Sequence, residues 1–158
     1  MTKREFVSWV EPIAHELIER RAEVVAFARS LPAGAWGEPS AIEGWTRGDV
    51  LAHLAGDTAK VSTAAMRSAI DADAPHPTYG ENEHALNARD VTARRDTPIV
   101  DLVAEIKSDG DAWRELLSRF EQDTDRRWPG FLVSLREYLN LLMPHDRDHL
   151  ADMRAGLA

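Results

Sequence analysis

The sequence contains no cysteine. Without cysteine the protein has no disulfide, no thiolate ligand for a metal and no cysteine nucleophile. If the protein performs thiol chemistry, the thiol must therefore come from a low-molecular-weight cofactor.

Long apolar runs are also missing. No stretch approaches the roughly 18 consecutive apolar residues that a membrane-spanning helix needs. The first five residues, MTKRE, lack the apolar core of a secretory signal. Strand-like alternation, internal repeats and low-complexity tracts do not stand out either. We therefore expect a cytoplasmic, helical protein with no membrane contact.

The charge of the chain is predominantly negative. Asp and Glu number 27 against 19 Lys and Arg, which gives a formal net charge of −8, and the acidic residues are spread over the whole length. Such a surface repels a phosphate backbone, so we expect no nucleic-acid partner. The 158 residues, 44% of them hydrophobic, are enough to bury a core. We expect residues 1–158 to form a single domain.

Apolar residues recur at helical spacing in four long stretches. These stretches cover approximately residues 12–31, 47–69, 98–120 and 135–153. A more polar helix over residues 81–95 is expected to cover the core rather than to build it. This helix belongs to a long connection between the second and third core helices, which permits a crossover. The pattern predicts an all-α four-helix bundle.

Two helix starts are marked by capping signals. Thr46 is followed three residues later by Asp49, and Ser134 is followed at the same spacing by Glu137. In this pattern the hydroxyl oxygen accepts a hydrogen bond from the backbone of the third helical residue. The second and fourth core helices are therefore expected to begin directly after Thr46 and Ser134.

The last predicted helix carries two histidines, His145 and His149, four residues apart. This spacing places both imidazoles on one face, with about 5–6 Å between their Cβ atoms. His149 falls within the apolar stripe of the helix and His145 on its flank. A buried imidazole needs hydrogen-bond partners or a metal. By spacing alone, the pair is either part of a metal site or two hydrogen-bonded histidines at a helix end.

A third histidine, His53, lies on the flank of the apolar stripe of the second helix, and Asp57 follows one turn later. The remaining histidines have no partner at the spacing of metal ligands. We expect them to be exposed surface residues; they are His15, His76 and His84.

Two segments together resemble a known family. Residues 44–55 (GWTRGDVLAHLA) and residues 145–150 (HDRDHL) resemble the DinB/YfiT-like superfamily. The resemblance is strongest to the branch that contains the N-terminal domain of mycothiol-dependent maleylpyruvate isomerases and the ClbS-like proteins. It implies a four-helix bundle that holds a divalent metal through three side chains, and these positions map onto His53, His145 and His149.

Three imidazoles on zinc leave one coordination position open, which is the pattern of a catalytic site. Zinc is the expected metal, and nickel or iron suits the same ligands. Asp57 is the candidate acid or base near the metal, with a solvated carboxylate as the alternative. Tyr138 is a candidate to line the pocket and donate a hydrogen bond, with a core tyrosine as the alternative. Asp148 and Asp152 are candidates to orient the imidazoles.

The resemblance supports the metal better than it supports a reaction. Our first hypothesis is a metal-dependent enzyme acting on a small molecule, either a hydrolase or a transferase or isomerase that uses a low-molecular-weight thiol. The alternatives are a non-catalytic, metal-containing protein for small-molecule binding or self-resistance, and a metal-free structural bundle. An exposed face of the bundle would also permit a homodimer.

Pro144 lies inside the last predicted helix, directly before His145. Proline has no N–H to donate to the carbonyl of Asn140, and its ring clashes with that carbonyl. We expect a kinked but continuous helix, in which the kink re-aims both histidines.

Overall fold

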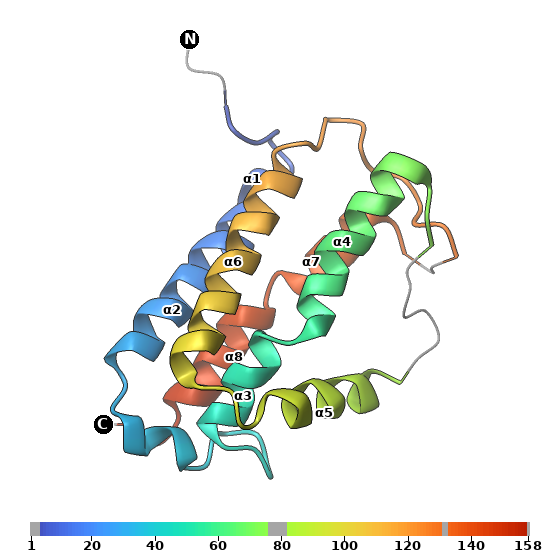
Figure 1. Ribbon diagram of the computed structural model, residues 1–158. Helices are drawn as coiled ribbons and strands as arrows, with labels where there is room; N and C mark the ends of the chain where they lie inside the picture. Colours follow the sequence, from blue (N-terminus) through green and yellow to red (C-terminus); the bar gives the residue numbers. More distant parts are fainter. Residues whose placement is uncertain (1–3, 76–81, 131–132, 158) are drawn as a thin grey trace.

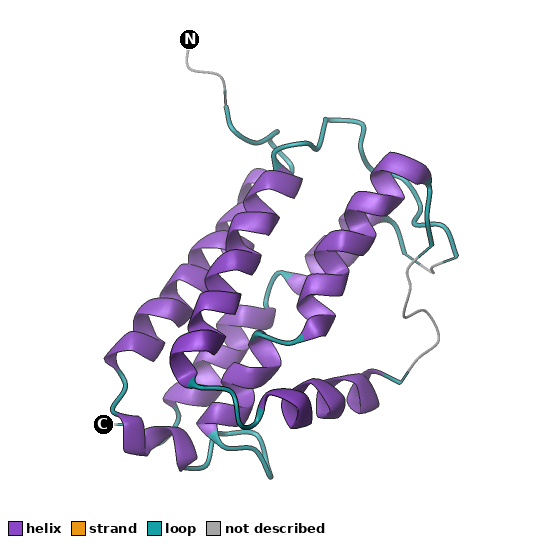
Figure 2. Cartoon of the chain, viewed as in Figure 1, coloured by secondary structure: helices purple, strands orange, loops and turns teal. Residues whose placement is uncertain are grey.

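The computed structural model describes residues 4–75, 82–130 and 133–157, without the side chains of residues 57–62. Within these ranges the chain is helical and contains no strand, so the all-α prediction is confirmed (Figure 2). The elements are α1 (Glu11–Ala14), the π-helical turn η1 (His15–Glu19), α2 (Arg20–Ser30), the 3₁₀ helix η2 (Ala33–Gly37), α3 (Arg47–Leu54), α4 (Asp57–Ala72), α5 (Glu83–Arg94), α6 (Ile99–Leu117), α7 (Leu135–Leu142) and α8 (His145–Arg154).

The long elements pack side by side as a bundle (Figure 1). Helix α2 contacts α6 and α8, and α3 contacts the same two helices. Helix α5 lies across one end of the bundle, against α3 and α4, within the long connection that leads to α6 (Figure 1). This placement confirms that the polar helix covers the core.

The second predicted helix is not continuous, because the chain leaves helical geometry between α3 and α4. Gly56 adopts an extended backbone, with φ −63° and ψ 163°. A Cβ at this position would lie 2.6 Å from Oδ2 of Asp90 on α5. The prediction of one helix over residues 47–69 was therefore wrong, since the close approach of α5 requires a glycine and a turn here.

The last predicted helix is also interrupted, so the expectation of a kinked but continuous helix was wrong. Helix α7 ends at Leu142 and α8 begins at His145. Met143 and Pro144 keep right-handed helical dihedrals, but Pro144 has no N–H to continue the ladder. The ladder restarts where the N–H of Asp148 donates to the Pro144 carbonyl at 2.9 Å.

The first long element contains a π-helical turn, η1, between α1 and α2. Such turns are rare and occur frequently at functional sites. These three irregular positions lie within three residues of three side chains that are central to the site below: Arg21 after η1, His53 before Gly56 and His145 after Pro144.

Two hydrophobic clusters form the core. One joins α1, α4 and α7 to the C-terminal part of α6, around Trp113 and Trp128. The other joins α2, α3 and α8 to the N-terminal part of α6, around Leu51 and Ile106. Each of α2, α3, α4, α6, α7 and α8 therefore buries residues in one cluster or the other, whereas no described residue of α5 contributes to either.

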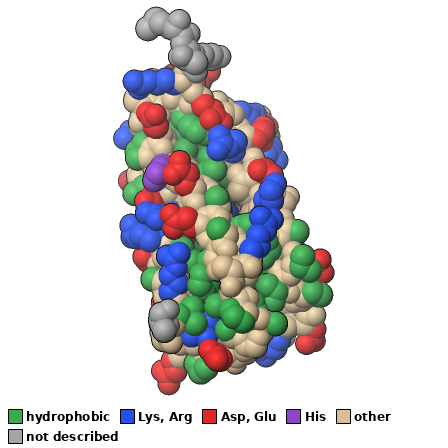
Figure 3. Space-filling model, turned by 90° about the vertical axis from the view of Figure 1, so that its left-hand side faces the viewer, with side chains coloured by type: hydrophobic (Ala, Val, Ile, Leu, Met, Phe, Trp, Pro, Cys, Tyr) green, Lys and Arg blue, Asp and Glu red, His purple; other side chains and the backbone are tan. Residues whose placement is uncertain are grey.

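Charged side chains of both signs lie on one face of the molecule. On the face shown in Figure 3, acidic and basic side chains are interspersed over the upper part and hydrophobic side chains gather over the lower part. No helix in the described ranges has the length and apolar character required to cross a membrane.

Candidate metal centre

The start of α3 is fixed as the sequence predicted. The N–H of Asp49 donates to Oγ1 of Thr46 at 3.1 Å, and the N–H of Thr46 donates to Oδ2 of Asp49 at 3.0 Å. An equivalent box at Ser134 and Glu137 starts α7. These caps satisfy backbone donors that would otherwise lack a partner, so they set where each helix begins.

A buried arginine joins the helices that carry the histidines. The Arg47 side chain at the start of α3 donates from Nε to the Met153 carbonyl at 2.8 Å and from Nη2 to the Ala155 carbonyl at 2.9 Å. These carbonyls lie at the end of α8, where helical acceptors lack partners within the helix. Arg47 therefore holds α3 and α8 together.

The three predicted histidines converge. One ligand nitrogen from each of His53, His145 and His149 lies within 4.8 Å of the other two. Nε2 of His53 and Nε2 of His145 are 3.1 Å apart. The ring centroids of His53 and His149 are 4.8 Å apart, and those of His145 and His149 are 4.6 Å apart. Residues separated by 92 positions in sequence thus form one cluster of imidazoles.

Carboxylates orient two of the three rings. Nδ1 of His149 lies 3.0 Å from Oδ2 of Asp152, and Nδ1 of His145 lies 3.2 Å from Oδ1 of Asp146. An ionised carboxylate only accepts hydrogen bonds, so each Nδ1–H donates and leaves the Nε2 lone pair of a neutral ring for the centre. Asp152 lies where the sequence predicted an orienting residue, whereas Asp148 is exposed and pairs with Arg147.

His53 is the most buried of the three rings. Its Nδ1 has no hydrogen-bond partner among the described residues, and the ring centroid of Trp45 lies 5.5 Å from its own. Burial, together with the nearby His145 and His149, lowers the pKa of His53 to about 3. Burial and His145 also lower the pKa of His149. Loss of the proton is therefore easy at both residues, and the neutral imidazole is the form that binds a metal.

Behind His145 lies a buried charged cluster that the sequence analysis missed. Nε of Arg21 is 2.9 Å from Oδ2 of Asp146, and Nη1 of Arg21 is 3.4 Å from Oδ2 of Asp109. Burial acts to raise the pKa of Asp146, but Arg21 and His145 outweigh it and lower that pKa. All three charged side chains are at most 6% exposed. In the sequence, each of these charged residues occupies a position on the apolar stripe of its helix, and this is the signal by which the cluster could have been found.

The donor set fits a divalent metal. Nitrogens bound to a tetrahedral zinc at about 2.0–2.1 Å lie roughly 3.3 Å from one another. The 3.1 Å between Nε2 of His53 and Nε2 of His145 is close to that spacing. Three imidazoles suit zinc, nickel or iron better than magnesium or calcium, which prefer oxygen ligands.

The remaining predictions concern Asp57, Tyr138 and the other histidines. Asp57 opens α4, but its side chain lies outside the described residues. Tyr138 on α7 packs its ring against Trp128 with centroids 5.0 Å apart. The roles of Asp57 and Tyr138 stay predictions. His15 and His84 are exposed, as expected, and His76 lies outside the described residues.

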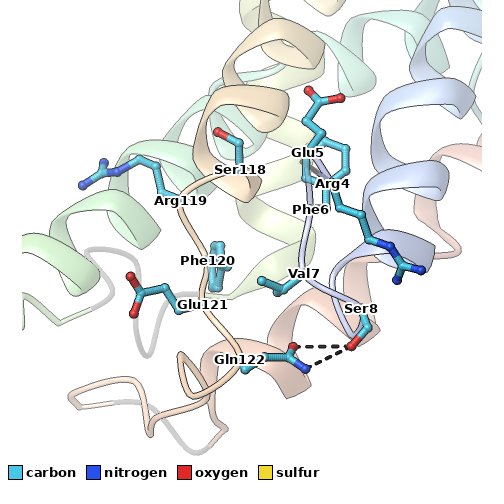
Figure 4. A pocket seen from close by; sticks show the side chains of 10 residues that line it. All are labelled: Arg4, Glu5, Phe6, Val7, Ser8, Ser118, Arg119, Phe120, Glu121 and Gln122. Atoms are coloured by element: carbon cyan, nitrogen blue, oxygen red, sulfur yellow. Dashed lines mark hydrogen bonds between the residues drawn. The ribbon is translucent and has the colours of Figure 1, made fainter. Parts of the chain in front are cut away.

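A pocket elsewhere contains none of the predicted site residues. It lies between the N-terminal segment and the loop after α6, where Ser8 and Gln122 hydrogen-bond to each other across it (Figure 4). Side chains of residues 4–8 and 118–122 line this pocket. We therefore place the candidate site at the histidines rather than here.

The fold and the three imidazoles define a helical bundle with a candidate three-histidine metal centre. A family model described as the mycothiol maleylpyruvate isomerase N-terminal domain matches residues 17–147. The chain therefore belongs to this family, in the DinB/YfiT-like superfamily. The match includes His53 and His145 and ends two residues before His149. Comparisons with curated proteins and with solved structures found no match.

Proposed function

We propose that this protein is a metal-dependent enzyme that acts on a small molecule and holds a divalent ion through His53, His145 and His149. The observation that carries the proposal is the convergence of three imidazole nitrogens within 4.8 Å from two different helices. The carboxylates on Nδ1 of His145 and His149 add to it, because carboxylate–histidine pairs are typical of metal sites.

Zinc is the metal we propose first, with nickel and iron as the alternatives. Three protein ligands leave a coordination position for a substrate or water, as catalytic zinc sites do. When bound, such an ion supplies Lewis-acid chemistry: it polarises a carbonyl or lowers the pKa of a water or thiol.

The side chains of the site differ in exposure, which indicates the side from which a substrate approaches. The side chains of His145 and His149 are 34% and 19% exposed. His53 is buried and has Trp45 beside it. We propose that the substrate enters on the α8 side, with His53 at the closed end of the site.

The family description supports a reaction that uses a low-molecular-weight thiol, because it names a mycothiol maleylpyruvate isomerase. The chain has no cysteine, so such a thiol would have to be a small molecule. We propose a thiol-dependent transferase or isomerase, with a hydrolase as the second reaction class. Asp57 is proposed as the acid or base and Tyr138 as a hydrogen-bond donor.

The metal is tested first by elemental analysis of the purified, untagged protein beside a His149→Ala variant. We expect near-stoichiometric zinc, nickel or iron in the parent and its loss in the variant, which removes one of three ligands. His15→Ala is the matched control, because His15 is an exposed histidine that pairs with Glu19. Absence of metal from the parent after soaking with excess ion would contradict the proposal and favour a metal-free bundle.

The reaction is tested by incubating the metal-loaded protein with electrophilic substrates, with and without small thiols, and with esters. Thiol-dependent consumption of an electrophile that His149→Ala lacks would support the transferase or isomerase. Hydrolysis without a thiol would support the hydrolase. A metal-bound protein with no turnover of any of these would favour a binding or self-resistance protein.

A further inference from the structure

We propose that Arg21 is a positioning residue for the metal centre, acting through Asp146 on the imidazole of His145. This inference rests on the proposed metal site. Arg21 lies on α2 and His145 on α8, so the connection joins the first and last long elements of the bundle.

The connection uses both oxygens of one carboxylate. Oδ2 of Asp146 lies 2.9 Å from Nε of Arg21, and Oδ1 of the same carboxylate lies 3.2 Å from Nδ1 of His145. Nε2 of His145, on the other side of its ring, lies 3.1 Å from Nε2 of His53. Fixing the carboxylate thus fixes which nitrogen of His145 points into the centre.

Asp146 directly follows His145 and contacts its ring from the same turn of α8. A contact from another helix is therefore what can fix the carboxylate relative to the rest of the bundle. Nε of Arg21 and Oδ2 of Asp146 form a close ion pair, although their geometry is not that of a hydrogen bond. Arg21 is held in turn by Asp109 on α6, at 3.4 Å from Nη1. Three elements of the bundle therefore fix the orientation of this carboxylate.

The burial of Arg21 sets it apart from its neighbour. Arg21 is 4% exposed, whereas Arg20 extends along the surface to Glu16 and Glu23 on its own helical segment. A guanidinium offers several donors in a rigid planar fork, so it can hold two carboxylates in fixed positions. A lysine would retain the charge but not the fork.

The experiment measures zinc affinity of the full-length protein by competition with a chelator, in Arg21→Gln, Arg21→Lys and Asp146→Asn. Loss of a residue that orients a metal ligand typically lowers affinity by about 10- to 100-fold. We expect a loss of that size for Arg21→Gln and Asp146→Asn and a smaller loss for Arg21→Lys. Arg20→Gln and Asp148→Asn are matched controls, for which we expect the parental affinity.

A double variant separates positioning from general destabilisation. If Arg21 acts through Asp146, the variant with both Arg21→Gln and Asp146→Asn loses no more zinc affinity than the weaker-binding single variant. Independent structural damage would instead multiply the two losses. Multiplied losses, or parental affinity in the folded Arg21→Lys and Arg21→Gln variants, would overturn the proposal.

A second measurement uses the metal-free protein and does not depend on metal binding. Imidazole ¹⁵N resonances distinguish a ring that carries its proton on Nδ1 from one that carries it on Nε2. We expect His145 to carry it on Nδ1 in the parent and in Arg20→Gln, to lose that preference in Arg21→Gln, and to lose part of it in Arg21→Lys. An unchanged preference in folded Arg21 variants would overturn the inference about Arg21. A parent that binds neither zinc, nickel nor iron would overturn the proposed function, whereas the proton position on His145 would still test the contact from Arg21 through Asp146.

Discussion

His53 differs from the other two histidines in having a buried Nδ1 without a partner among the described residues. An imidazolium at this position would be poorly solvated and close to two further rings. The folded protein therefore favours the neutral ring, and the pKa of His53 falls to about 3 from an ordinary value of 6.5.

This shift predicts a pH-dependent stability of the metal-free protein. Between pH 6.5 and pH 3 the unfolded chain binds a proton at His53 that the folded chain does not, so stability falls as the pH falls through this window. The contribution of His53 amounts to about 2 kcal/mol between pH 7 and pH 5. His149 acts in the same direction because its pKa is also lowered. Urea unfolding of the metal-free protein at these two pH values measures the effect.

A His53→Gln variant serves as the comparison, since it removes the titrating group. Its stability should depend less on pH between 7 and 5 than that of the parent. Equal pH dependence of the parent and the variant would show that His53 is not held neutral by the fold.

The local signals in the sequence were sufficient for two helix starts, whereas the set of three candidate ligands came from the family resemblance. The capping boxes at Thr46 and Ser134 depend on residues three positions apart, so no tertiary contact is needed to recognise them. The buried cluster at Arg21 was missed because its partners lie 88 and 125 positions further along the chain. Only the fold brings these charges together, although each lies on an apolar stripe.

At the scale of helical elements, the interruptions of the bundle are the main departure from the predicted pattern. Periodicity describes the apolar face of a helix but not where a neighbouring element forces the chain to turn. Pro144 carried a visible signal, whereas the role of Gly56 depends on the approach of Asp90 from α5. The helix break beside His53 therefore could not be predicted from local sequence.

The close contact at Gly56 predicts that Gly56→Ala destabilises the protein. The added Cβ would lie 2.6 Å from Oδ2 and 2.9 Å from Cβ of Asp90. Crowding of this kind costs about 1–3 kcal/mol, and it should appear as a lower urea midpoint. Gly34→Ala is the control, since a Cβ at Gly34 meets nothing within 4 Å. If both variants were as stable as the parent, α5 would not be held against the α3–α4 junction.

At the scale of the whole molecule, the bundle brings distant segments to one point. Arg47 joins the start of α3 to the end of α8, and Arg21 joins α2 to α8 and α6. The histidines themselves come from only two helices, α3 and α8. Both buried arginines therefore act on the helix that supplies two of the three proposed ligands. This arrangement suits a centre whose geometry must be set before a substrate binds.

The most direct test of the metal centre is X-ray absorption at the zinc edge of the zinc-loaded, full-length protein. We predict three imidazole nitrogens at about 2.0–2.1 Å and one further light ligand in the parent, and loss of this three-imidazole shell in His149→Ala. A shell of oxygen ligands with one imidazole or none, or the same spectrum in His149→Ala as in the parent, would contradict it.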